Sequence, residues 1–219
     1  MNILRTRNNT ILFYCLFAAF VLWQLPGILP PVSYESDAVS ISMGIEDASR
    51  TGWHNLGKTG YGYWMQPLTY ILLAAVKAIL PHVQAQAIYS ILSSLAAIAL
   101  QWVCILLVVR ISGLSRFYAL AALALFPEFY ALAMYPNSTA IAALPVFVGF
   151  LLLTSPRLTS RRLVPAALLL TLAPLLRLDV IIIYPLAIVL LRHSGMGIKK
   201  TAALSAAYAL FLILFLIAF

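Results

Sequence analysis

The chain has 219 residues, of which 63% are hydrophobic and only 9% are charged, and its mean hydropathy is +1.00. A water-soluble domain of this length needs more charge to cover its surface, so the composition excludes that class and indicates that lipid surrounds most of the chain. The net charge of +8 is distributed between apolar segments, which argues against nucleic acid as a partner. Because lipid offers backbone groups no water and the apolar runs do not alternate, we expect one all-α membrane domain over residues 1–219.

The first predicted element is an apolar helix over residues 11–29. Arg5 and Arg7 precede it, and no small-residue cleavage site follows it, so we interpret it as an uncleaved first membrane helix. The positive-inside rule then places the N-terminus in the cytoplasm. We expect a multi-pass protein of a cell inner membrane or plasma membrane.

Residues 31–66 form the only long polar segment, which we place on the outer side of the membrane. Ser36 or Asp37 can cap a short helix that continues to about Arg50. Its apolar residues recur at helical spacing and define one face: Ala38, Ile41, Ile45 and Ala48. The remainder of the loop is rich in glycine and aromatic residues, and aromatic residues favour the membrane–water boundary.

The next element is a short apolar helix over residues 67–80, with Pro81 after it. Fourteen helical residues reach about 21 Å, whereas the hydrocarbon core is about 30 Å thick. We therefore expect a juxtamembrane or re-entrant helix, which also places the later arginine and lysine clusters in the cytoplasm. This placement of the short helix gives the chain about seven crossings, over residues 11–29, 87–109, 117–135, 138–153, 163–176, 180–191 and 202–219.

The turn Arg177-Leu178-Asp179 lies between two apolar arms of about 18–21 Å, too short to carry it to the outer water. We expect it at the bottom of a cavity, where ionisable groups indicate a functional site. Residues two apart do not face each other on a helix, so we do not expect Arg177 to pair with Asp179. A structural alternative pairs Arg177 with Glu128 or with Asp179, or directs it to lipid headgroups. Glu128 itself follows Pro127, which loosens its helix, and it fits a site group and a buried ion pair equally well.

The order of these segments resembles the integral-membrane glycosyltransferases of the GT-C fold, which use polyprenyl-phosphate sugars. Protein O-mannosyltransferases, aminoarabinose transferases and oligosaccharyltransferases are members, and they share a seven-helix N-terminal module. The matching segments are Ser36-Asp37-Ala38, the stretch over residues 52–64, Gln66-Pro67-Leu68-Thr69-Tyr70, Tyr135-Pro136-Asn137-Ser138 and Arg177-Leu178-Asp179. The resemblance covers the whole chain.

The resemblance implies roles for individual residues. Asp37 occupies the position of the general base or metal ligand, and Glu35 replaces it if the register is shifted. Arg177 occupies the position that holds the donor phosphate, with His54 and Lys58 as further candidates for that anion.

A second acidic position is usual near the next outer loop of the family. This chain has Asn137 there and Glu128 earlier, which puts a divalent cation (Mg²⁺ or Mn²⁺) held by Asp37 and Glu128 in doubt. Asp179 and Asn137 are expected to line the cavity. Family members are usually longer, so we expect a minimal version, or a module that works with a missing C-terminal region or a partner subunit.

Physical chemistry supports the same reaction. An arginine fork stabilises the charge that develops on a departing phosphate, and a carboxylate removes the proton of the attacking hydroxyl, so that direct displacement inverts the anomeric centre. A small transporter or lipid flippase is the first alternative, but the long polar loop has no counterpart after residue 110, so no repeat symmetry is visible. A non-catalytic assembly subunit is the second, and it would tolerate loss of Asp37 and Arg177.

Overall fold

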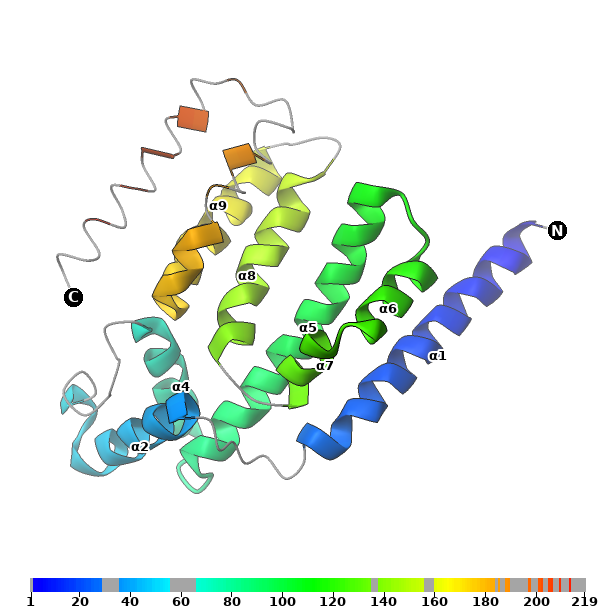
Figure 1. Ribbon diagram of the computed structural model, residues 1–219. Coiled ribbons are helices and arrows are strands. Elements are labelled where there is room, and N and C mark those ends of the chain that lie inside the picture. The colour runs from blue at the N-terminus through cyan, green and yellow to red at the C-terminus, as the bar shows by residue number, and fades with distance from the viewer. Residues whose placement is uncertain are drawn as a thin grey trace.

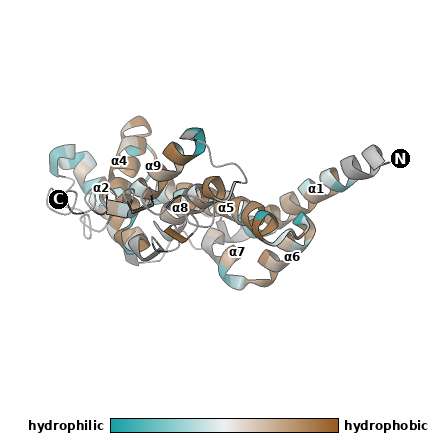
Figure 2. Cartoon of the chain, turned by 90° about the horizontal axis from the view of Figure 1, so that it is seen from above, coloured by the Kyte–Doolittle hydropathy of each residue, from teal (hydrophilic) through white to brown (hydrophobic). Residues whose placement is uncertain are grey.

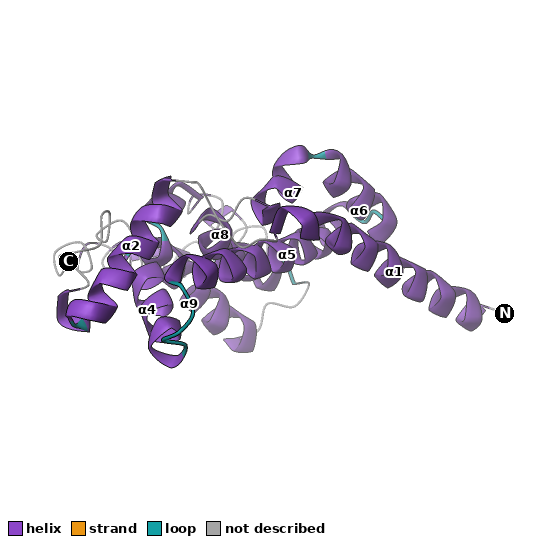
Figure 3. Ribbon diagram, turned by 90° about the horizontal axis from the view of Figure 1, so that it is seen from below, coloured by secondary structure: helices purple, strands orange, loops and turns teal. Residues whose placement is uncertain are grey.

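The structure is a computed structural model that describes residues 2–28, 36–55, 66–134, 138–155 and 160–183, with scattered residues between 185 and 213. Every regular element in these residues is helical, as predicted (Figures 1 and 3). The elements are α1 (Asn2–Ile28), α2 (Ser36–Thr51), η1 (Trp53–Asn55), α4 (Pro67–Ile79), α5 (Ala85–Ser112), α6 (Arg116–Leu125), α7 (Pro127–Met134), α8 (Ser138–Leu153), α9 (Ser160–Leu176) and η3 (Leu178–Ile183).

The predicted helix over residues 117–135 is two helices, α6 and α7. Phe126 separates them with φ −96° and ψ 105°, which are not helical values. The ring of Pro127 causes this break, because a residue before proline is pushed out of the α region. The prediction of one continuous helix here was therefore wrong, although Pro127 had already indicated a weak point.

Only α5, of the helices in the described ranges, combines the length and the apolar character that crossing a membrane requires. The other apolar helices are shorter: Asn9–Leu25, Pro67–Ile79, Arg116–Leu125 and Ser138–Leu153. The predicted crossing over residues 180–191 begins as the 3₁₀-helix η3, and residues 184, 186, 187, 190 and 191 of it lie outside the described residues. Most of the predicted crossing over residues 202–219 lies outside them as well. The seven-span bundle therefore stays a prediction.

Helix α5 is the central element, with α8 beside it, α9 beside α8, and α1 crossing the other side (Figure 1). Phe13 and Phe20 of α1 pack with Leu100 and Ile105 of α5 in a buried apolar cluster. A polar contact also crosses this interface, where the amides of Gln24 and Gln101 exchange hydrogen bonds of 3.2 and 2.9 Å.

Hydrophobic residues predominate in the helices (Figure 2), and many large ones are exposed. Among the side chains of α1 that the structure describes, six large hydrophobic ones are exposed: Ile11, Leu12, Tyr14, Leu16, Leu22 and Trp23. Exposed apolar surface of this extent on a helix indicates a partner that is itself apolar.

The short helix predicted after Ser36 is α2, and its predicted apolar face is confirmed. Ala38, Ile41, Ile45 and Ala48 are at most 1% exposed and pack in one cluster with residues of α4 and α5. The predicted helix over residues 67–80 is α4. Together α2 and α4 lie against the N-terminal part of α5 (Figure 1).

Candidate functional site

Arg177 lies at a junction of helix ends. It directly follows α9 and precedes η3, and its Nη1 donates a hydrogen bond of 2.8 Å to the hydroxyl of Ser138, the first residue of α8. The neighbouring carbonyl of Leu176 accepts a 2.6 Å hydrogen bond from Thr69 in the first turn of α4. Arg177 therefore lies where the C-terminus of α9 meets the N-termini of α4 and α8.

Arg177 also pairs with Asp179, which the helical spacing argued against and which the structural alternative had included. Its Nε donates to both carboxylate oxygens of Asp179 at 2.9 Å. The prediction assumed helical geometry, but Arg177 lies outside α9, and in a turn a spacing of two residues no longer separates the side chains. The side chain of Asp179 is 59% exposed and that of Arg177 is 26% exposed, so water screens the pair.

The helix dipoles at this junction favour a cation at the C-terminus of α9 and an anion near the N-termini of α4 and α8. The unpaired carbonyls that end a helix carry partial negative charge, which the Arg177 guanidinium complements at the C-terminus of α9. The N-termini of α4 and α8 carry partial positive charge. Gln66, at the start of α4, is buried, and its side-chain oxygen has no hydrogen-bond partner in the part of the chain that the structure describes.

The other predicted site residues are only partly placed. Asp37 lies in the first turn of α2, but its side chain is outside the described part, and Glu35, Lys58 and Asn137 lie outside the described residues altogether. His54 lies on η1 and is exposed.

Glu128 is exposed on the first turn of α7. No group of three His, Cys, Asp or Glu side chains capable of holding a metal ion occurs among the described residues. The proposed ligands Asp37 and Glu128 therefore stay a prediction.

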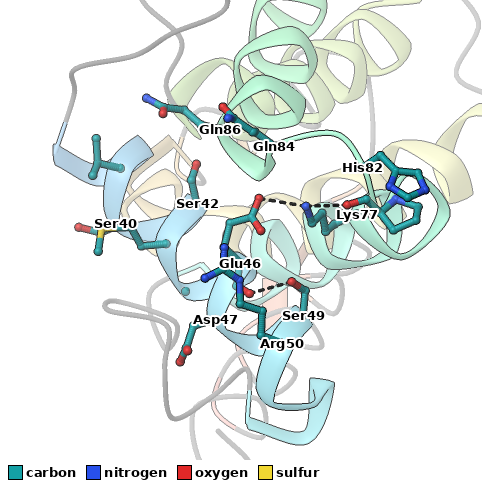
Figure 4. Close-up of a pocket in the computed structure, with 14 residues that line it drawn as sticks. Ser40, Ser42, Glu46, Asp47, Ser49, Arg50, Lys77, His82, Gln84 and Gln86 are labelled. Atoms are coloured by element: carbon teal, nitrogen blue, oxygen red, sulfur yellow. Dashed lines mark hydrogen bonds and ion pairs between the residues drawn. The ribbon is translucent and has the colours of Figure 1, made fainter.

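Sequence reasoning missed a second polar cluster, at the other end of α4. The ammonium of Lys77 lies 3.0 Å from the Glu46 carboxylate of α2 (Figure 4). It also donates to the carbonyls of Pro81 at 3.1 Å and Val83 at 2.8 Å. The same Glu46 oxygen accepts a 2.7 Å hydrogen bond from the backbone N–H of Ala85, the first residue of α5. One carboxylate thus joins three helices.

A sequence signal for this cluster existed. Lys77 follows Tyr70 and Leu73 at intervals of seven and four, so it lies on the buried face of α4 and requires an anionic partner. Burial raises the pKa of Glu46, but the hydrogen bonds from Ala85 and Lys77 and the charges of Lys77 and Arg50 outweigh it. The net pKa of Glu46 is lowered from its ordinary value of 4.5. Glu46 is therefore ionised at neutral pH.

Comparisons with protein-family models, with curated proteins and with solved structures find no match to this chain.

Proposed function

We propose that this chain is a membrane glycosyltransferase module that takes its sugar from a polyprenyl-phosphate donor on the non-cytoplasmic side. The observation that carries the proposal is the environment of Arg177. Its guanidinium is partly accessible, it is held by Ser138 and Asp179, and the N-termini of α4 and α8 lie beside it. A phosphate group suits this arrangement, because guanidinium and helix N-termini both favour phosphate oxygens.

The apolar exterior supports a place in the membrane for such a module. The 28-residue helix α5 is long enough to cross a bilayer, and the exposed hydrophobic face of α1 provides a surface for lipid chains. A donor whose polyprenyl chain lies in the bilayer presents its phosphate at the membrane boundary.

The proposed reaction is a single displacement at the anomeric carbon. Asp37, or Glu35 in its place, accepts the proton of an acceptor hydroxyl, and that oxygen bonds to the anomeric carbon. The bond from that carbon to the phosphate oxygen breaks, and the electron pair leaves with the polyprenyl phosphate. Arg177 donates hydrogen bonds to the departing phosphate, whose negative charge grows as the bond breaks.

Binding of a polyprenyl monophosphate to variants of Arg177 tests the phosphate site. Arg177→Ala removes charge-assisted hydrogen bonds worth about 1.5–3 kcal/mol, so affinity should fall about ten- to a hundredfold. Arg177→Lys keeps the charge but loses the planar fork, so an intermediate loss is expected. The unphosphorylated polyprenol measures the contribution of the apolar chain alone, and Arg162→Ala, at the exposed N-terminal end of α9, is the matched control.

Thermal stability of the same variants separates the proposal from a purely structural role. The screened ion pair with Asp179 contributes about 0.2–1 kcal/mol and the hydrogen bond to the buried Ser138 about 0.5–1.5 kcal/mol, so Arg177→Ala should lose no more than about 1–3 kcal/mol and stay folded. Unchanged polyprenyl-phosphate affinity in both variants would end the phosphate-site proposal.

Asp37→Asn tests the proposed base. We expect normal insertion, unchanged polyprenyl-phosphate affinity and transfer lowered about a hundred- to ten-thousandfold. Transfer at the wild-type rate would remove Asp37 from the reaction and direct attention to Glu35. Phosphate binding without any transfer would instead favour a non-catalytic assembly subunit.

A further inference from the structure

A pocket of about 1020 Å³ with polar and apolar lining lies at the end of α4 remote from Arg177. It is open to solvent and lies between the outward face of α2, the turn between α4 and α5, and the start of α5 (Figure 4). We call it the α2 pocket, and the lining residues that matter here are Ser40, Ser42, Asp47, Arg50, His82 and Gln84. Lys77 is ten residues beyond Pro67 along α4, so the pocket lies about 15 Å from the Arg177 junction.

The Lys77–Glu46 ion pair, which lines the α2 pocket, already has hydrogen-bond partners within the chain. All three hydrogens of the Lys77 ammonium have acceptors, in Glu46 and in the carbonyls of Pro81 and Val83. Glu46 is occupied by Lys77 and by the N–H of Ala85. This pair closes one side of the pocket and contributes no net charge to a ligand.

The two exposed charged side chains of the α2 pocket, Asp47 and Arg50, carry opposite charges. They lie three residues apart on α2. A strongly anionic ligand would meet the Asp47 carboxylate, and a cationic one would meet Arg50. The lining therefore suits a ligand without net charge that can both donate and accept hydrogen bonds.

The remaining polar side chains are hydroxyls, amides and the imidazole of His82. Ser42 is only 5% exposed, and its hydroxyl oxygen has no hydrogen-bond partner in the described part of the chain. Figure 4 shows the Ser42 hydroxyl directed from α2 toward the start of α5, where Gln84 lies. A buried hydroxyl without a partner costs about 1–3 kcal/mol, which a ligand hydroxyl in the pocket would recover.

Apolar surface borders these polar groups. Met43 is 66% exposed and Val39 is 37% exposed, and both line the pocket. A sugar ring has hydroxyl groups at its edge and C–H groups on its faces, so it matches a wall of hydroxyl, amide and carboxylate groups beside exposed aliphatic side chains.

We propose that the α2 pocket binds an uncharged saccharide. Asp47 accepts hydrogen bonds from the sugar hydroxyls, Arg50 and Gln84 donate to their oxygens, and Ser42 completes its hydrogen bonding with the ligand. This binding site goes beyond the proposed transfer and does not depend on it, because none of its residues belongs to the Arg177 junction.

Saturation-transfer NMR on the full chain in detergent, with a panel of neutral methyl glycosides, tests the saccharide site. We expect at least one glycoside to bind with a dissociation constant below about 10 mM. Asp47→Ala should weaken it about tenfold or more, and Ser42→Ala about three- to tenfold. Asp47 is exposed, so its variant should fold normally, and a wild-type melting temperature verifies this.

Two controls make the result specific to the pocket. Asp179→Asn and Arg177→Ala change the other junction and should leave glycoside binding unchanged, even where polyprenyl-phosphate binding is lost. Failure of phosphate binding with glycoside binding intact thus refutes only the proposed function. The saccharide proposal is overturned if no glycoside in the panel binds below that limit, if neither pocket variant weakens binding, or if inorganic phosphate competes with the glycoside.

Discussion

Replacing Glu46 by glutamine should destabilise the chain, because Glu46 links α2, α4 and α5. The substitution keeps the size of the side chain but removes the charge that faces the Lys77 ammonium at 3.0 Å. Lys77 would keep only neutral acceptors, which are the new amide oxygen and the carbonyls of Pro81 and Val83. The Lys77 side chain is 8% exposed, so its charge would then be buried without a counter-ion.

The magnitude follows from the exposure of the two partners. Breaking a fully buried ion pair costs about 3–5 kcal/mol, whereas breaking an exposed pair costs less than about 1 kcal/mol. Glu46 is 29% exposed and Lys77 is 8% exposed, so we expect about 1–3 kcal/mol. For a chain of this length that corresponds to a decrease of about 2–12 °C in melting temperature.

Heating in the presence of a thiol-reactive fluorophore measures this difference. The chain has two cysteines, Cys15 exposed and Cys104 buried, so a Cys15→Ser background leaves Cys104 as the only thiol and its labelling reports unfolding. Glu128→Gln, which removes an exposed carboxylate from α7, is the matched control and should melt like the parent.

The difference in stability between wild type and Glu46→Gln should decrease as the pH falls. The folded-state pKa of Glu46 lies below its ordinary value of 4.5, so folding favours the ionised form. The stabilisation is therefore complete above about pH 5 and is lost as the pH falls through the lowered pKa. The double variant Glu46→Gln/Lys77→Met should recover part of the loss, because no buried charge then lacks a partner.

Two results would refute this reasoning. The first is a Glu46→Gln protein that melts within experimental error of its parent at pH 7. The second is a difference between the two proteins that persists unchanged below the pKa of Glu46. Either would mean that the contacts of Lys77 with Pro81 and Val83 suffice to hold the turn between α4 and α5.

Two further predictions concern the remaining helices. Gln101→Leu should cost about 1–3 kcal/mol and lower the melting temperature, because Gln24 and the carbonyl of Phe129 lose the hydrogen bonds that the Gln101 amide supplies. The double variant with Gln24→Leu should be less destabilised. Equal stability of wild type and Gln101→Leu would contradict the reasoning. For topology, cysteines introduced at Gly113 and Ser160 should react with an impermeant reagent only from the cytoplasmic side, and labelling of either from outside would overturn the proposed topology.

Local features of the sequence predicted much of the fold. The spacing of Ala38, Ile41, Ile45 and Ala48 predicted the buried face of α2, because helical periodicity is set by the backbone alone. Pro127 indicated a weak point in its helix, because the proline ring restricts the residue before it. Neither feature needs a distant partner. The proposed roles of Asp37 and Arg177 in catalysis stay predictions.

Tertiary structure alone decided how the polar side chains pair. Glu46 and Lys77 are 31 residues apart, and Gln24 and Gln101 are 77 apart, so no local pattern links them. The partner of Arg177 was predicted wrongly because the side-chain direction depends on where α9 ends, and α9 ends at Leu176, one residue before it. Helical periodicity predicts which residues face the core. The partner of a buried polar group depends instead on which helices pack together, and that is a property of the folded chain.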